Sequence, residues 1–143
     1  MKNTMGCSWS IEELPGLSAK ERSLLTSCKI NTTQDLLASA RTPQQQQELA
    51  AELQIHAQYV RKWVAMADLA SIHSVGCQYC GLILHAGIAS VAQLAQTPVH
   101  RLHRQILRLQ VATMQRKDLC PSVDEVQKWV KEAATLSRTS QLN

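Results

Sequence analysis

The stretch Leu14-Pro-Gly-Leu-Ser18, followed by a helical pattern that ends at Ile30, decides the fold because a related stretch occurs later in the chain. Ile72-His-Ser-Val-Gly76 matches it at an offset of 58 positions and leads to a similar pattern that ends at Ile88. Between the paired segments, apolar residues fall on apolar residues. Repeats of this length predict a duplicated helical unit in which each copy covers part of the other's apolar face.

A second internal match lies near the end of each copy. At an offset of 66 positions, Trp63 aligns with Trp129 inside two Lys-Trp-Val segments. The two offsets differ by 8, which predicts a short insertion within residues 114–121 of the second copy. Because the two tryptophans occupy matching positions, we expect both to be core residues, and base stacking is the alternative use of such a side chain.

Capping patterns mark where helices begin. A Ser or Thr side chain accepts a hydrogen bond from a free backbone N–H, and a Glu or Gln three residues later reaches back. Four pairs fit: Ser18 with Glu21, Thr42 with Gln45, Ser90 with Gln93, and Ser122 with Glu125. Pro43 and Pro98 follow threonines at a first helical position, where a missing N–H is harmless. No segment alternates with the period of two that is typical of a strand.

The composition also favours packed helices. Hydrophobic residues make up 45% of the 143 residues, yet Phe is absent, so the core consists mostly of Leu, Ile, Val and Ala. The longest strongly apolar run, residues 80–85, is far shorter than the roughly 20 residues that span a bilayer. Residues 1–8 have no apolar signal-peptide segment, so we expect a cytoplasmic protein with no membrane span. The five cysteines are then reduced thiols.

The two glycine-containing stretches resemble the helix-hairpin-helix pattern. Over residues 10–137 the chain resembles a tandem helix-hairpin-helix-like bacterial family described only as a domain of unknown function, type 4332, with cyanobacterial members closest in style. In DNA-binding helix-hairpin-helix proteins, two glycines that flank a hydrophobic residue let backbone N–H groups approach a phosphate. The resemblance therefore implies phosphate contacts at Gly16 to Ser18 and at Ser74 to Gly76. Each hairpin has lost one glycine, and the hydroxyl of Ser18 either contacts a phosphate or caps the helix.

We therefore predict an all-α fold of two tandem helix-hairpin-helix-type repeats packed into one compact domain. The predicted parts are an N-terminal tail (1–9), a first repeat (10–70), a second repeat (71–137) and a C-terminal tail (138–143).

The net charge of +4 arises in the second half. Residues 1–68 carry seven Lys/Arg and seven Asp/Glu, whereas residues 69–143 carry eight against four. No acidic residue occurs between Ser71 and Lys117. Three arginines there have a spacing of three and four residues, which puts them on one helix face: Arg101, Arg104 and Arg108. Such a stripe contacts phosphate, contacts an acidic protein partner, or is simply the solvated face.

A zinc site is the other chemical possibility. His73, Cys77, Cys80 and His85 are residue types that bind zinc, but a helix from Gly76 turns His85 away from the cysteines. We therefore expect Cys77 and Cys80 to be small buried hydrophobes, with no metal and no cofactor. No phosphate-binding glycine loop, nucleophile elbow or carboxylate pair is present, so we do not expect an enzyme.

Together these patterns favour a non-catalytic module that binds nucleic-acid backbones without sequence preference through the basic second repeat. The alternative is a protein–protein adaptor or assembly factor on the same scaffold, with an acidic protein as the partner. In either case we expect a monomer or small oligomer. The predicted contact residues are Ser74, Val75, Gly76, Arg101, Arg104, Arg108, Gly16 and Ser18.

Overall fold

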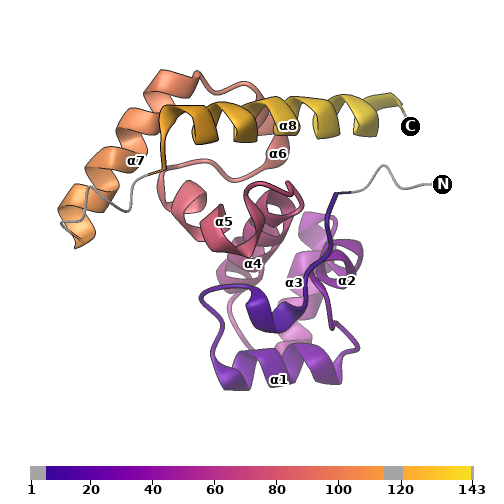
Figure 1. Cartoon of the computed structure of the whole chain (residues 1–143). Helices are drawn as coiled ribbons and strands as arrows, with labels where there is room; N and C mark the ends of the chain where they lie inside the picture. Colours follow the sequence, from indigo (N-terminus) through magenta and orange to yellow (C-terminus); the bar gives the residue numbers. More distant parts are fainter. Residues whose placement is uncertain (1–5, 115–120, 143) are drawn as a thin grey trace.

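A computed structural model describes residues 6–114 and 121–142 (Figure 1). Within these residues the chain is helical and contains no strand, so the predicted all-α class is confirmed. The elements in chain order are η1 (Ile11–Glu13), α1 (Ala19–Ser27), α2 (Thr33–Ser39), α3 (Pro43–Leu53), α4 (Ala57–Ala70), α5 (Gly76–His85), α6 (Val91–Ala95), α7 (Val99–Met114) and α8 (Val123–Leu142). No helix among the described residues combines the length and the apolar character needed to cross a membrane.

The capping residues predicted from the sequence form the expected hydrogen bonds. Ser18 and Thr42 each accept from the third backbone N–H of their helix, and Glu21 and Gln45 complete the two capping boxes. The hydroxyls of Ser90 and Ser122 likewise accept from the backbone N–H groups of Gln93 and Glu125, at 3.0 and 3.1 Å. A further capping box that the sequence analysis did not predict starts α2, where Thr32 pairs with Asp35. The helix starts are thus fixed by local chemistry.

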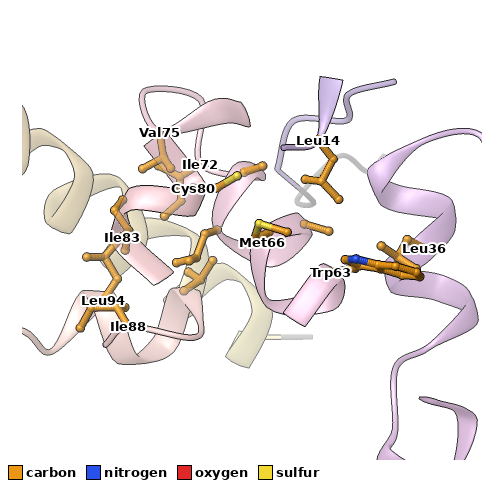
Figure 2. Close-up of a cluster of buried hydrophobic side chains, with 14 of the residues drawn as sticks. Leu14, Leu36, Trp63, Met66, Ile72, Val75, Cys80, Ile83, Ile88 and Leu94 are labelled. Carbon is orange, nitrogen blue, oxygen red and sulfur yellow. The ribbon is translucent and has the colours of Figure 1, made fainter. Parts of the chain in front are cut away.

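Helix α4 lies at the centre of the molecule. It packs against α2 and α3 on one side and against α5 on the other. The buried residues of α4 lie on about half of its circumference. They are Val60, Trp63, Met66, Ala67, Leu69 and Ala70. Figure 2 shows Trp63 and Leu36 side by side, with Met66 next to them on the way to the α5 side chains. This apolar face must be covered by other elements, and because helices from both parts of the chain cover it, α4 joins the two halves.

In the second half of the chain, α8 is the helix against which the others pack. This helix packs on α6 and α7, and Trp129 is 0% exposed there. The ring of Trp129 lies 5.0 Å from that of Tyr79 on α5, centroid to centroid, at an interplanar angle of 45°. Trp63 is 2% exposed. The prediction that both tryptophans are core residues is therefore confirmed.

The N-terminal strap, residues 7–10, ties the two halves together. Trp9 accepts from the N–H of Thr33 at the start of α2, at 2.8 Å, and its indole Nε1–H donates to the carbonyl of Ala70 at the end of α4, at 2.7 Å. The N–H of Cys7 donates to the carbonyl of Ser71 at 2.8 Å. The sequence analysis assigned residues 7–9 to a tail, whereas here they are bound to helices from both halves.

Asp68 forms a second link between the halves. Its Oδ2 accepts the backbone N–H of Val91, the first residue of α6, at 2.8 Å. Burial of the carboxyl group raises its pKa, and the hydrogen bond from Val91 opposes this shift only in part. The carboxylate thus holds the start of α6 on α4 although burial disfavours its charged form.

Replacement of either buried tryptophan tests this core. We expect Trp63→Ala and Trp129→Ala each to lower the free energy of unfolding by about 3–5 kcal/mol, because truncation leaves a large cavity. Urea unfolding followed by circular dichroism measures the change. Tyr59→Ala is the matched control, because Tyr59 is 43% exposed and its loss should change stability by less than about 0.5 kcal/mol. Equal stability of the tryptophan variants and the control would contradict this core.

Asp68→Asn tests the buried carboxylate. Folding raises the pKa of the Asp68 carboxyl group. The contribution of this group to stability is therefore fully present below the pKa of the unfolded chain, and it is lost as the pH rises through the pKa of the folded protein. The asparagine carbonyl still accepts from Val91 but carries no charge. We therefore expect the variant to match the wild type near about pH 3 and to be the more stable protein at about pH 7. A variant that is less stable at neutral pH would show instead that the charge stabilises α6.

Candidate nucleic-acid interface

The arginine face of α7 is formed by Arg101, Arg104 and Arg108, which are all exposed. Leu102, Ile106 and Gln110 lie on the buried side of the same helix. This division follows from the sequence, since apolar Leu102 and Ile106 are four residues apart on one face and the arginines occupy the adjacent face. Among the described residues, no side chain forms an ion pair or hydrogen bond with the three guanidinium groups. Their charge is therefore available to an external anion.

Two adjoining hollows border this face. The first, with a volume of about 390 Å³, is lined by the three arginines and Gln105. The second, of about 340 Å³, shares Arg101 and Gln105 with the first and extends to the loop between α5 and α6. Its remaining lining includes Gly87, Gln93 and Gln96. The surface is thus concave and rich in guanidinium and amide donors, which are the groups that bind phosphate and sugar oxygens.

The second hairpin, residues 72–76, is closed by contacts within the protein. The N–H and the hydroxyl of Ser74 both donate to Oε1 of Glu132 on α8, at 3.2 and 3.0 Å. Val75 is 1% exposed, and Gly76 is buried. A Cβ added to Gly76 would lie 3.2 Å from the Trp9 ring, and the φ of +53° at this position favours glycine. Glycine is therefore required here for close packing under Trp9.

The structure does not bring the second hairpin together with the arginine face. The hollow beside Arg101 borders residues 86–88, which follow the C-terminal end of α5, whereas the hairpin precedes its N-terminal end. Helix α5 has 10 residues and so spans about 15 Å between these ends. Neither hollow on the arginine face is lined by Ser74, Val75 or Gly76. The predicted contact residues of the second repeat therefore fall into two separate groups.

The first hairpin, residues 14–18, is more open. Gly16 is exposed with a φ of +84°, and a Cβ there would approach no atom closer than 3.8 Å. Ser18 caps α1, and the carboxylate of Glu21 accepts the N–H of Ser18 at 2.8 Å. The sequence left two roles open for Ser18, and in the structure its side chain is the cap of α1. A carboxylate thus lies where the helix dipole would attract an anion.

The cysteines and histidines of α5 do not form a cluster. His73 and His85 are exposed at opposite ends of the helix, whereas Cys80 is buried and Cys77 is half-buried. The described residues contain no group of three His, Cys, Asp or Glu side chains arranged to hold a metal ion. Burial raises the pKa of the Cys77 thiol to about 11 and that of the Cys80 thiol to about 12. Both thiols are therefore protonated at neutral pH, as expected of small apolar side chains.

Two residues that shape these sites were missed by the sequence analysis, Trp9 and Glu132. Trp9 lies before the first repeat, so no internal match marked it. Glu132 is 58 positions from its partner Ser74, and no local spacing connects the two. The sequence carries no local signal for this bond.

Thiol alkylation tests the protonation of Cys77 and Cys80. At about pH 8 we expect both to react with iodoacetamide about a hundredfold or more slowly in the folded protein than in urea, because only the thiolate reacts. The rate in the folded protein should then rise about tenfold per pH unit toward pH 10, since the thiolate fraction grows in that proportion. Peptide mass spectrometry at timed intervals measures both rates. Equal rates in the folded and unfolded protein would contradict burial of the thiols.

Comparison with known proteins gives one match. The model of the family called domain of unknown function (DUF4332) matches residues 15–136, which is most of the chain. No curated protein and no solved structure matches this chain. The matched span includes the second hairpin, residues 15–18 of the first hairpin, the arginine face and the two buried tryptophans. The chain therefore belongs to the DUF4332 family of domains of unknown function.

Proposed function

We propose that the protein is a non-catalytic module that binds the phosphate backbone of nucleic acid without sequence preference. The observation that carries this proposal is the arginine face of α7, with three exposed guanidinium groups that no described acidic side chain neutralises. Contacts to phosphate position a protein on nucleic acid but carry no sequence information. Affinity from such a face therefore depends on charge and falls with salt.

The geometry of the arginine face supports this use. Arg101 and Arg108 are seven positions apart and so lie about 10 Å apart along the helix axis. Their planar guanidinium groups can each bind a phosphate through two N–H donors. Gln105 lies within the same row and lines both hollows, so its amide is available to sugar or phosphate oxygens. One strand of a nucleic acid is the simplest ligand for a row of this kind.

In this proposal the hairpins are structural. The carboxylate of Glu132 already accepts from Ser74, and Trp9 covers Gly76. A phosphate at the second hairpin would have to displace a carboxylate of like charge. The contact residues are thus reduced to the arginine face and its amide neighbours, and the hairpins serve to set the angle between successive helices.

We also propose that the chain is a tandem pair of helix-hairpin-helix-type units. Helix α4 begins at Ala57 and α8 begins at Val123, which agrees with the offset that aligns the two tryptophans. Helix α2 packs on α4 as α6 packs on α8, and α3 packs on α4 as α7 packs on α8. A cytoplasmic location goes with this proposal, because Cys7, Cys28, Cys77 and Cys80 are free thiols.

An adaptor that binds an acidic protein is the second candidate function. The hairpins favour it, because the backbone N–H groups of Ser18 and Ser74 already donate to carboxylates. The arginine face would then pair with carboxylates instead of phosphates.

The triple variant Arg101→Ala/Arg104→Ala/Arg108→Ala tests the proposal. If each arginine neutralises one phosphate, the slope of log K against log salt on duplex DNA should become shallower by roughly 2–3 units, and affinity should fall equally across sequences. Fluorescence anisotropy with duplex DNA, single-stranded DNA and RNA over a salt series measures the slope.

The matched control is Arg41→Ala/Arg61→Ala/Lys62→Ala, which removes the same charge from exposed positions outside α7. We expect it to change the slope by less than about 1 unit. An equal loss in both variants would contradict a defined α7 site. If the wild type binds no nucleic acid at about 50 mM salt, where phosphate contacts are strong, the adaptor becomes the better proposal.

A further inference from the structure

We propose that a groove between α2 and α4 is a docking site for an amphipathic helix of a partner protein, with carboxylates at one end of its apolar face. The groove has a volume of about 770 Å³, and its lining includes Arg41, Arg61, Leu37, Val64 and Asp68. None of these residues belongs to the arginine face of α7. The proposed site is therefore separate from the nucleic-acid interface and does not depend on it.

One wall of the groove is a single face of α4. Arg61, Val64, Ala65 and Asp68 follow each other at spacings of three and four residues, which places them in one row. The row is about 10 Å long, or two helical turns. It begins with an exposed guanidinium group and ends with a carboxylate, so the wall is positive at one end and negative at the other.

The opposite wall is α2, which runs against α4. At its start, Thr33 is bonded to Trp9, whose indole is bonded to Ala70 at the end of α4. Arg41 follows the C-terminal end of α2. Because the start of α2 lies near the end of α4, this C-terminal end lies toward the first part of α4, where Arg61 is located. Among the described residues, no ion pair or hydrogen bond is formed by either guanidinium group. Two free cations therefore share one end of the groove.

The middle of the groove is apolar. Leu37, Val64 and Ala65 are half-buried, so each keeps part of its surface in the groove. Leu37 and Val64 also pack against the main hydrophobic core, which fixes their positions. The groove is a preformed depression between two rigid helices, and a third helix fits such a depression by packing its side chains between theirs.

The charge pattern selects the occupant. Carboxylates near the C-terminal end of a docked helix would pair with Arg41 and Arg61. The positive N-terminal end of that helix would then lie beside Asp68, where its dipole is favourable. One oxygen of Asp68 already accepts from Val91, and the other end of the groove has no acidic side chain in its lining. A basic helix would be repelled by the two arginines, and Asp68 is the single carboxylate in the groove lining that could attract it.

Selection from a peptide library tests the proposal with the full-length protein. The probe is a phage-displayed set of about 16-residue helical peptides in which one face varies among apolar residues and both flanks vary among Glu, Gln and Lys. We expect enriched peptides to have apolar residues at spacings of three and four, with Glu concentrated near the C-terminal end. In spectra of ¹⁵N-labelled protein, a synthetic copy of the best binder should shift resonances of α2 and α4.

Charge and apolar variants then locate the contact. Arg41→Ala/Arg61→Ala should weaken the selected peptide about tenfold, whereas Arg101→Ala/Arg104→Ala, which removes equal charge from α7, should change its affinity less than about twofold. Val64→Glu should abolish peptide binding while binding to DNA persists, which separates this site from the α7 face. Circular dichroism establishes that each variant is folded.

Several results would overturn the docking site. They are enrichment of basic or uncharged peptides, absence of enrichment above background, shifts confined to α7, or equal affinity of the wild type and the Arg41/Arg61 variant. Sedimentation could also overturn it, if the wild type forms a dimer and the Val64→Glu variant does not. A second copy of the chain would then occupy the groove.

Discussion

The burial of α4 is the constraint on which the rest of the structure depends. Toward its C-terminal end, Met66, Ala67, Leu69 and Ala70 are all buried, and together they lie on about half of the circumference of the helix. Such a face is stable only when other elements cover it. Helices α2 and α3 cover one side, α5 covers another, and the Trp9 indole reaches the Ala70 carbonyl. The halves of the chain therefore form one packed body, with the arginine face of α7 and the groove beside α2 at its surface.

Local and periodic signals predicted the framework of this body. The caps at Ser18 and Thr42 depend on residues three positions away, and the tryptophans recur at a fixed offset, so both were visible in the sequence. The strap, the Ser74–Glu132 bonds and the Asp68–Val91 bond join residues 23 to 64 positions apart. No spacing rule links such pairs, because their proximity exists only after the helices have packed. The arginine face was predicted from periodicity, whereas its separation from the second hairpin required the fold.

The hairpins illustrate how residue type decides whether backbone N–H groups are open to a ligand. A glycine at either end of the motif leaves room for a phosphate at the backbone N–H groups. Here Ser18 and Ser74 stand at those positions, and in each hairpin the serine N–H is bonded to a carboxylate, from Glu21 or Glu132. The donors are thus satisfied within the protein, and an incoming anion gains nothing from them without displacing an internal one. This is why both proposals place the ligand on side chains of the outer helix faces.

Those faces are held at fixed positions relative to each other. Asp68 lines the groove beside α2 and also accepts the N–H of Val91 at the start of α6. Helix α6 is only five residues long, and the turn that follows it contributes Gln96 and Thr97 to the hollow next to Arg101. Helix α8 packs on the other side of α6. Because this short helix is fixed from both sides, the groove and the arginine face belong to one rigid frame. In Figure 1, α7 and α2 lie on different sides of that frame, so the two proposed sites do not overlap.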